Sequence, residues 1–450
     1  MRRVAQAASS LILVLSACAQ PATQHNDASV DANVDSATKS ASAASGALAQ
    51  LSALQREANA LKTPLAVYAF YRERWSQAHG GLRDLIAQVL AATEAELGAY
   101  EQAVLQFPHG APGLRSTPAP LPDAENYRAV NAADGIAQLA RERRIVIVNE
   151  AHHVGQTRLL TLQLLPRLRA LGYTHFAAEA LDERDRDLAT RGHATIASGS
   201  YVREPLYAEI IRSALKLGFV IVPYESTRAD ADADTREDDQ ARHLLEGVFR
   251  VQPDARLFVH AGYAHAHKRA GYLDTDPMAL RLKRISGFDP LSIDQTLLRP
   301  IEAAREYKDY RTLLRRFAID APTIFLSRRD GLAWSLEPSF YDVSVVLPPP
   351  DHQIVGRPDW LTLNGERTPV AIDLDVQEDH LPCMLEARAV AESEKAVPAD
   401  RVLIERAEVQ AVLFLRPGSY RIALIDAKGR MLNQRRLLVT SDADAPTKNP

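Results

Sequence analysis

The stretch IVIVNEAHH, at residues 145–153, predicts both the fold and the place where its chemistry lies. Four β-branched residues in succession are typical of a parallel strand that is buried on both faces. The strand then ends in Glu150, His152 and His153, polar groups that a buried strand does not need for its own packing. Open parallel sheets bind ligands outside the carboxyl ends of their strands. We therefore interpret this stretch as the floor of an active or binding site.

Apolar runs and helical patterns alternate around this stretch. The further strand-like runs cover residues 175–179, 219–222, 257–260 and 291–293, and a later one covers 342–347. The segments with helical apolar spacing cover residues 131–144, 157–171, 205–217 and 236–249. Such alternation indicates βαβ units, and it predicts an α/β fold with a mainly parallel sheet flanked by helices.

The rest of the chain divides around this core, which we place at residues 126–365. Residues 46–107 carry apolar residues at helical spacing and predict a helical segment that packs on the main domain or acts as a spacer. Residues 366–440 alternate with period two between tight turns, which is typical of a small antiparallel, β-sandwich-like domain for packing or binding. Residues 441–450 have the composition of a disordered tail.

Residues 1–18 have the pattern of a signal peptide. Two arginines precede an apolar run that is too short to span a bilayer, and Leu-Ser-Ala-Cys, ending at Cys18, resembles a bacterial lipobox. The resemblance implies cleavage before Cys18, lipidation of its thiol and acylation such as palmitate, which would anchor the protein to a membrane. Ala19 after the cysteine implies the periplasmic face of the outer membrane. The alternative is an ordinary secretory signal with a chance cysteine.

The segment that follows Cys18 and the overall composition narrow the class of protein. Residues 19–45 contain few large apolar groups and predict a flexible tether. The formal net charge of -4, without a basic cluster interleaved with aromatics, argues against nucleic acid as a partner. No glycine-rich phosphate loop follows a predicted strand, and Gly-x-Ser-x-Gly is absent, which argues against nucleotide binding and a serine hydrolase. The second cysteine, Cys383, has no partner if Cys18 is acylated, and we expect it to be a buried apolar residue.

Four successive predicted strands end in a carboxylate or an imidazole. These groups are Glu150, His152, Glu179, Glu225, His260 and His265. In a parallel sheet the four ends lie along one edge, so the groups are expected to converge in one crevice. Convergence of this kind favours either a metal held by His and Glu or a general acid–base cluster. In an extended segment, His265 and His267 are two residues apart and would face the same ion.

These motifs, in this order, resemble the superfamily that groups erythromycin esterases, the haem-binding ChaN lipoproteins and the TraB/Tiki proteins. The segments that carry the resemblance are Asn149-Glu150-Ala151-His152, Ala178-Glu179, Gly262-Tyr263-Ala264-His265 and the helix start at 236–241. The resemblance covers about residues 130–300. Asn149 stands where the family usually has glycine. Because asparagine tolerates unusual backbone angles, we expect the turn to be kept.

The resemblance implies three different roles on one fold. In the Tiki branch the matching residues look like metal ligands and catalytic groups of a peptidase. In the esterase branch the first-motif histidine, here His152, acts as a general base on water without a required metal. In the ChaN branch a lipoprotein binds haem. Each matching residue also has a purely structural interpretation, as part of a hydrogen-bonded turn or a helix cap.

The site prediction follows from the strand ends and the resemblance together. The expected catalytic residues are Glu150, His152, Glu179, His265 and Arg236. The expected ligands of a divalent ion, Mn, Co or Zn, are Glu150, His152, Glu179, Glu225 and His265. The expected supporting residues around them are His153, His260, His267 and Tyr263.

Hydrolysis of a small-molecule or peptide substrate, with peptidase- or esterase-like chemistry, is the leading hypothesis for function. Water would be activated by His152 with Glu150, or by a bound metal ion. One alternative is a haem- or iron-binding lipoprotein without turnover. Another is a cell-envelope interaction protein whose site has decayed.

Overall fold

The computed structural model describes residues 45–108, 114, 117–228, 231–270, 275–302, 305–351, 353–407 and 410–440. The predicted signal peptide with Cys18, the tether up to residue 44 and the tail at 441–450 lie outside these residues. Among the helices of the described part, none is both long and apolar enough to cross a membrane.

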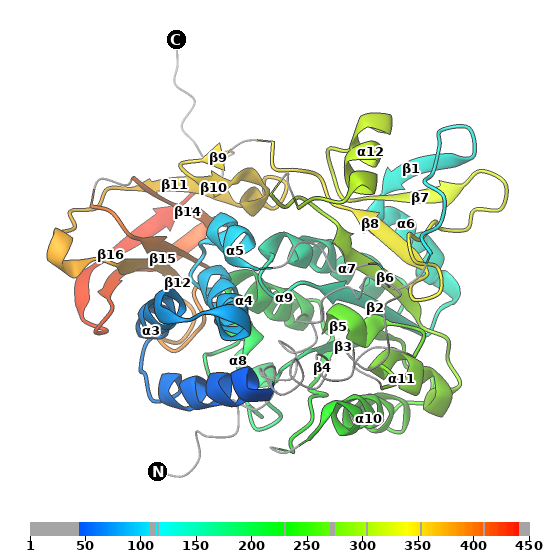
Figure 1. Ribbon diagram of the computed structural model, residues 1–450, viewed down its shortest axis with the longest axis horizontal. Coiled ribbons are helices and arrows are strands. Elements are labelled where there is room, and N and C mark those ends of the chain that lie inside the picture. The colour runs from blue at the N-terminus through cyan, green and yellow to red at the C-terminus, as the bar shows by residue number, and fades with distance from the viewer. Residues whose placement is uncertain are drawn as a thin grey trace, which may run out of the picture.

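An eight-stranded sheet with the order β1-β7-β8-β6-β2-β5-β3-β4 forms the centre of the molecule (Figure 1). The parallel strands are β8 (Val343–Val346), β6 (Leu291–Leu298), β2 (Ile145–Glu150), β5 (Leu257–Gly262), β3 (His175–Ala178) and β4 (Val220–Val222). Two antiparallel strands, β7 (Thr323–Ser327) and β1 (Tyr127–Asn131), complete one edge. The predicted α/β fold with a mainly parallel sheet is confirmed.

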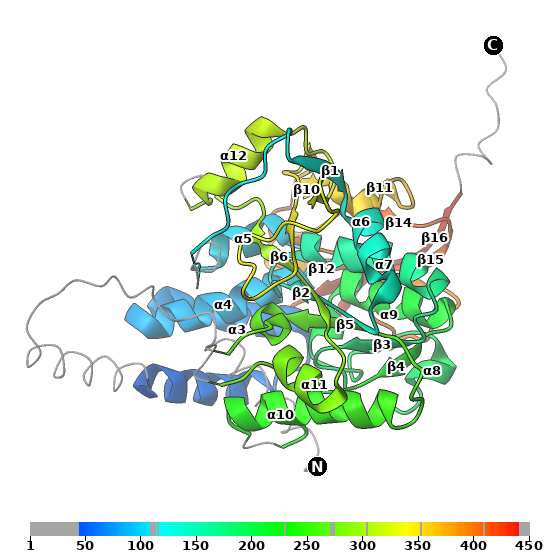
Figure 2. The ribbon, with the colours of Figure 1, turned by 90° about the vertical axis from the view of Figure 1, so that its right-hand side faces the viewer.

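Helices cover both faces of this sheet. One face carries α6 (Ala132–Leu139), α7 (Leu159–Ala170) and α9 (Pro205–Lys216), and the other carries α10 (Ala233–Leu244) and α11 (Met278–Ser286) (Figure 2). A four-residue helix, α8 (Leu188–Arg191), adds Leu188 to the first layer, and α12 (Lys308–Arg316) packs in a separate cluster beside β7 and β8. Strand β2 is buried on both sides, because Val146 and Val148 pack in the first layer and Ile145 and Ile147 in the second.

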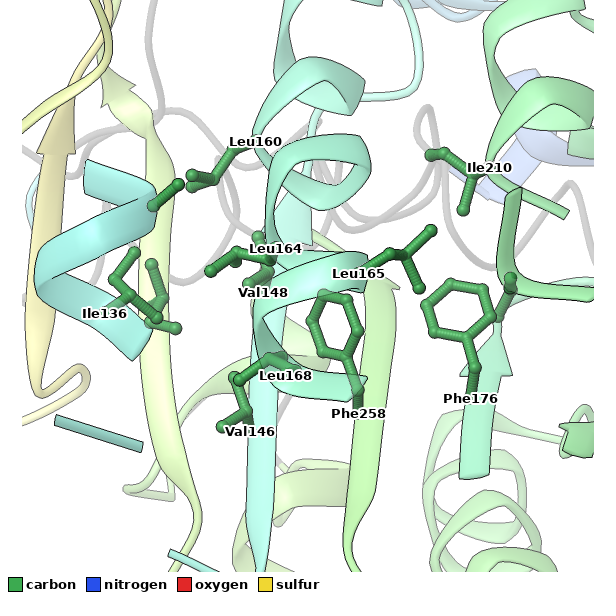
Figure 3. Packing of buried hydrophobic residues seen from close by; sticks show 14 of the residues in the cluster. Ile136, Val146, Val148, Leu160, Leu164, Leu165, Leu168, Phe176, Ile210 and Phe258 are labelled. Atoms are coloured by element: carbon green, nitrogen blue, oxygen red, sulfur yellow. The ribbon is translucent and has the colours of Figure 1, made fainter. Parts of the chain in front are cut away.

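The packing of α7 shows why the strand sequence is apolar throughout. Leucines at positions 160, 164, 165 and 168 of α7 lie over Val146 and Val148 of β2 and over Phe258 of β5 (Figure 3). All of these side chains are fully buried. Truncating any one of these leucines to alanine is expected to cost about 2–5 kcal/mol. This layer fixes β2 and β5, whose ends carry the site.

The N-terminal helices pack mainly on the C-terminal sheet. They are a helix at residues 45–58, α3 (Pro64–Gln77), α4 (Gly80–Glu96) and α5 (Tyr100–Gln106). Their apolar side chains form one cluster with Met384 and Leu403 of that sheet, and Figure 1 shows α3 and α4 beside β12. Helix α5 also contacts Leu206 of the core, so the helical segment joins the other two parts of the molecule.

The C-terminal part consists of small antiparallel sheets, as predicted. A four-stranded sheet has the order β13 (Asp400–Ile404), β12 (Cys383–Ala389), β15 (Gly418–Asp426), β16 (Met431–Val439). A two-stranded sheet pairs β11 (Thr368–Ile372) with β14 (Ala411–Leu415), and a shorter one pairs β9 (Gln353–Ile354) with β10 (Arg357–Pro358). Apolar residues of the first two sheets share one buried cluster, to which the buried Cys383 belongs.

Candidate active site

The expected site lies at the carboxyl edge of the parallel strands. Strands β2, β5, β3 and β4 are direct neighbours and run the same way, so the residues that follow them meet on one edge. The groups converge as two hydrogen-bonded clusters, one around Glu150 and one around Glu179. Both carboxylates are at most 1% exposed.

Glu150 and His152 form a hydrogen-bonded pair at the end of β2. Nδ1 of His152 lies 2.8 Å from Oε1 of Glu150, which as a carboxylate accepts a hydrogen bond from the Nδ1–H group. The imidazole is stacked on Tyr201, with the ring centres 3.9 Å apart, and the ring of Tyr263 meets it edge-on. Nε2 of His152 is buried and has no hydrogen-bond partner among the described residues. A histidine oriented in this way presents one free basic nitrogen to the site.

A buried arginine holds Glu150 in place. Nε of Arg158 donates to Oε2 of Glu150 over 2.8 Å, and Nε2 of His260 lies 3.2 Å from the same oxygen. Burial raises the pKa of Glu150, but Arg158 and the hydrogen bonds of His152 and His260 outweigh it, so the net pKa lies well below its usual value. Nδ1 of His260 in turn lies 2.9 Å from the hydroxyl of Thr161. Glu150 is therefore a fixed anion that orients His152.

The same network extends to the N-terminal helices. Nη1 of Arg158 lies 3.2 Å from Oε2 of Glu204, and Oε1 of Glu204 accepts a 2.5 Å hydrogen bond from the hydroxyl of Tyr100 on α5. All three side chains are less than 5% exposed. Helix α5 is thus connected to Glu150 through two buried side chains.

The second cluster is organised by Arg236, near the start of α10. Its guanidinium donates to both oxygens of Glu225, over 2.8 and 2.7 Å, and to Oε1 of Glu179 over 2.9 Å. His265 lies on the other side of Glu179, with Nε2 3.5 Å from Oε1 of Glu179 and 3.0 Å from Nη1 of Arg236. Nδ1 of His265 faces Glu237 at 2.7 Å. Two cations therefore share three carboxylates, of which those of Glu179 and Glu237 are buried.

Neighbouring charges determine the protonation states of His265 and Glu179 in this second cluster. Burial alone would lower the pKa of His265, but the carboxylates of Glu237 and Glu179 outweigh it and raise the pKa to about 10. Burial alone would raise the pKa of Glu179, but His265 and Arg236, with His152, hold it well below its usual value. At neutral pH, His265 is an imidazolium and Glu179 is a carboxylate.

Gly262 is the point where the two clusters meet. Its backbone N–H donates to Oε2 of Glu179. A Cβ atom at this position would lie 2.5 Å from Cε1 and Nε2 of His152 and 2.7 Å from Oε2 of Glu179. Both groups therefore approach the backbone more closely than any side chain would permit.

The backbone is strained at the two strand ends that bring these groups together. Ala180, which follows Glu179, has a φ of 60°, and Tyr263, which follows Gly262, has a φ of 36°. Non-glycine residues seldom adopt such angles, and they cluster at functional sites where the surroundings hold them. The strain supports a functional interpretation of this edge.

The expected supporting residues have different surroundings. His260 contacts Glu150, as described above. His153 is buried, stacked on Phe107 with ring centres 3.8 Å apart, and lies 3.1 Å from the hydroxyl of Tyr263. His267 packs against Phe340 and the ring of Tyr341 instead. His265 and His267 thus contact different partners and do not face one common point.

Asn149 does not occupy a turn. It lies inside β2 and is absent from the residues with left-handed backbone angles. Its side chain accepts a hydrogen bond from the backbone N–H of Gln295 over 2.9 Å and donates to Asp294 over 2.9 Å. The expectation of an asparagine that tolerates a special turn is therefore wrong. Asn149 instead ties β2 to β6.

The donor set does not match a divalent ion in this arrangement. Among the described residues no group of three or more His, Cys, Asp or Glu side chains is placed to hold a metal. The carboxylates of Glu150, Glu179 and Glu225 are engaged by guanidinium groups, and the two ring nitrogens of His265 face Glu179 and Glu237. A metal ligand needs a deprotonated nitrogen or oxygen that is free to bind.

Sequence reasoning missed the residues that complete the clusters. Arg158 follows His152 by six residues, and no sequence motif marks it as part of the site. Glu204 precedes Pro205 at the start of α9, where its side chain accepts from the backbone N–H of Tyr207, so the Glu-Pro helix start was a visible signal. Glu237 is the immediate neighbour of Arg236 and was visible only as part of an acidic helix start.

A cavity of about 250 Å³ lies beside the second cluster. Its lining includes Ala180, Asp182, Arg184, Ser200, Glu225 and Arg228. It shares Glu225 with the cluster, and Ser200 precedes the tyrosine that stacks on His152. A larger cavity of about 990 Å³ lies between α7, α9 and the C-terminal sheets and includes no member of either cluster.

Comparisons with known proteins give little further information. No protein-family model matches the sequence, and no curated protein matches it. The chain is similar to the type III effector HopBA1, with a TM-score of 0.27 and 14% identity over 41% of this chain and 89% of that one. It is also similar to RRSP, a MARTX toxin effector domain from Vibrio vulnificus CMCP6, with a TM-score of 0.27 and 14% identity over 58% of this chain and 50% of that one. TM-scores this low support no transfer of fold or function.

Proposed function

We propose that this protein is a hydrolase in which Nε2 of His152 takes a proton from water as the water attacks an ester or amide carbonyl, and returns it to the leaving alcohol or amine as the C–O or C–N bond breaks. The observation that carries the proposal is the 2.8 Å pair of Glu150 and His152, with the second nitrogen of the imidazole buried and free of partners. A carboxylate in this position fixes the tautomer of the histidine and stabilises the imidazolium that forms.

The remaining groups have separate roles in this proposal. Arg158 and His260 keep Glu150 ionised and in place. Arg236 and His265 carry positive charge on the far side of Glu179, whose other carboxylate oxygen accepts from the backbone N–H of Gly262, and this charge would help to stabilise the oxyanion of a tetrahedral intermediate. Glu179 positions these two cations.

The resemblance of the sequence motifs supports the same class of reaction. Their order is similar to that in the erythromycin esterase, ChaN and TraB/Tiki superfamily, and the esterase branch uses its first-motif histidine without a required metal. We favour this route over a metal-assisted one, because guanidinium groups engage the carboxylates that would bind the ion. The chemistry suits a small-molecule or peptide substrate.

Turnover of a substrate panel tests the proposal. Neutral and charged p-nitrophenyl esters and a peptide library would be incubated with the wild-type chain, His152→Ala and the exposed control His79→Ala. We expect hydrolysis by the wild type and by His79→Ala, and a loss of about 10²–10⁴-fold in His152→Ala. Equal rates in the wild type and in His152→Ala, with both folded, would overturn the proposal. A haem absorbance band in the purified protein would favour the binding-protein alternative.

We also propose that the chain is anchored by lipid on Cys18 at the periplasmic face of the outer membrane. The support is the resemblance of residues 15–18 to a lipobox. Labelling with radioactive palmitate in the native host tests the anchor, since Cys18→Ser should abolish the label. A Cys18→Ser variant that keeps the label would refute it.

A further inference from the structure

Six arginines of the described chain are at most 4% exposed, and one of them differs from the rest. They are Arg158, Arg236, Arg299, Arg357, Arg367 and Arg401. Five have a carboxylate oxygen within 3.5 Å. Among the described residues, Arg299 has no carboxylate within 4.0 Å. A buried cation without a counter-ion is costly, so the exception calls for a physical explanation.

The contacts of Arg299 are long. Nε donates to the carbonyl of Thr296 over 3.2 Å, Nη1 to the carbonyl of Pro300 over 3.4 Å, and Nη2 lies 3.5 Å from Nε2 of His153. These distances lie at or beyond the upper end of the normal range for N–H donors. Burial lowers the pKa of Arg299, which is the direction expected for an undercompensated guanidinium. Its five N–H groups are therefore only weakly used.

Neighbouring groups do not supply the missing anion. The carboxylate of Asp294, which acts on Arg299 from beyond 4 Å, accepts hydrogen bonds from Asn149 and from the hydroxyl and backbone N–H of Thr296. The charge of Arg299 also acts on the side chain of Tyr307. The hydroxyl of Tyr307 is buried and has no hydrogen-bond partner among the described residues. One more polar donor near the guanidinium is therefore unused.

Arg299 lies on the same edge as the proposed catalytic pair. It directly follows β6, the neighbour of β2 in the sheet, and both strands run the same way. Its partner His153 is adjacent to His152 and lies 3.1 Å from the hydroxyl of Tyr263, whose ring meets His152 edge-on with centres 5.3 Å apart. Two side chains thus separate the guanidinium from the proposed base.

We propose that Arg299 binds an oxyanion group of the substrate, a carboxylate or a phosphate, which replaces the long contact to His153. A planar guanidinium pairs with either group through two parallel hydrogen bonds, and a buried pair of this kind is strong. The role in substrate selection rests on the proposed hydrolytic function. Anion binding itself does not, and it is measured without turnover.

Calorimetric titration with sodium acetate and, separately, inorganic phosphate tests the site. The proteins are the full wild-type chain in detergent, Arg299→Met, Arg299→Lys and a control, Arg329→Met, whose side chain is 91% exposed. We expect saturable binding of one anion per chain, weakened about tenfold or more in Arg299→Met and unchanged in Arg329→Met. Arg299→Lys should bind with intermediate affinity, because it keeps the charge but loses the bidentate geometry. The anion that binds more tightly identifies the acidic group of the substrate.

Two results would overturn the inference. One is the absence of saturable binding of both anions, and the other is equal binding in Arg299→Met and the wild type. His152→Ala should bind the anion like the wild type, so failure of the hydrolase proposal and failure of this one are distinguishable.

Thermal unfolding gives an independent readout. Without added anion, Arg299→Met should unfold at the same temperature as the wild type or higher, because an apolar side chain replaces an unpaired buried cation. At the same anion concentration, the wild type should gain more stability than Arg299→Met. A lower unfolding temperature of Arg299→Met without anion would show that the guanidinium is satisfied by the protein itself and would refute the proposal.

Discussion

Gly262 is the residue whose smallness the site most clearly requires. His152 and Glu179 both lie closer to its Cα than any side chain would permit. Because Gly262 has no side chain, His152 and Glu179 can both lie close to its backbone.

Gly262→Ala should therefore reduce activity more than stability. The added methyl group displaces the ring of His152 or the carboxylate of Glu179, at a cost of about 1–3 kcal/mol from overpacking. We expect kcat to fall by about 10²-fold, because a misplacement near 1 Å disturbs the attack geometry. Gly81→Ala, which has open space around its Cβ, is the control. Wild-type kcat in Gly262→Ala would show that the junction is not part of the site.

At this scale, the sequence could predict the chemical groups but not their partners. Glu150, Glu179, Glu225 and His265 were identifiable because each follows an apolar strand, and position along a parallel strand determines which edge a residue reaches. Asn149 was interpreted wrongly, because its role depends on β6, almost 150 residues later. Partner choice is set by tertiary packing, which local patterns do not encode.

Helix α5 is the element that connects the N-terminal segment to the chemistry. Tyr100 reaches Glu204 and, through Arg158, the carboxylate that orients His152. The sequence indicated a helical segment that packs on the main domain or acts as a spacer. Its main contacts are with the C-terminal sheet, whereas Tyr100 of α5 and Phe107 just after it contact residues of the site.

Tyr100→Phe tests this connection. Without the hydroxyl, Glu204 is expected to pair more strongly with Arg158 and to weaken the hold of Arg158 on Glu150. A hydrogen bond worth about 1 kcal/mol corresponds to about a fivefold loss of kcat, with little change in KM. The control is Tyr310→Phe, which also removes a buried hydroxyl, one that donates to the carbonyl of Leu347. If both variants retain the wild-type kcat, the network has no positioning role.

Among the elements, the core strands and helices were predictable because hydrophobic periodicity determines them. The strand predicted at 291–293 is longer, extending to Leu298 as β6. Its second half contains Asp294, Gln295 and Thr296, which break the apolar pattern. These residues are buried because they hydrogen-bond to β2 and to one another. Hydrophobic patterns do not reveal the part of a strand whose buried side chains are polar and form hydrogen bonds with one another and with the neighbouring strand.

For the whole molecule, the buried charges of the site link stability to pH. The folded protein raises the pKa of His265 from 6.5 to about 10, so the folded state binds one more proton than the unfolded state between these values. The stability contributed by His265 is therefore fully present below pH 6.5 and is lost as the pH rises toward 10.

Urea unfolding at several pH values checks this linkage. The free energy of unfolding of the wild type should fall between pH 6.5 and 10 more steeply than that of His265→Gln. His79→Gln, at an exposed position, should behave like the wild type. Parallel curves for the wild type and His265→Gln would mean that His265 is not protonated in the folded protein.

Glu150 and His152 should act as one catalytic unit, and a double-mutant cycle on kcat/KM measures the coupling between them. The cycle compares Glu150→Gln, His152→Ala and the double variant on the best substrate of the panel. If the carboxylate acts only through the imidazole, the double variant should be no slower than His152→Ala alone. Losses that multiply in the double variant, or full activity in His152→Ala, would show that the two residues do not act as one catalytic unit.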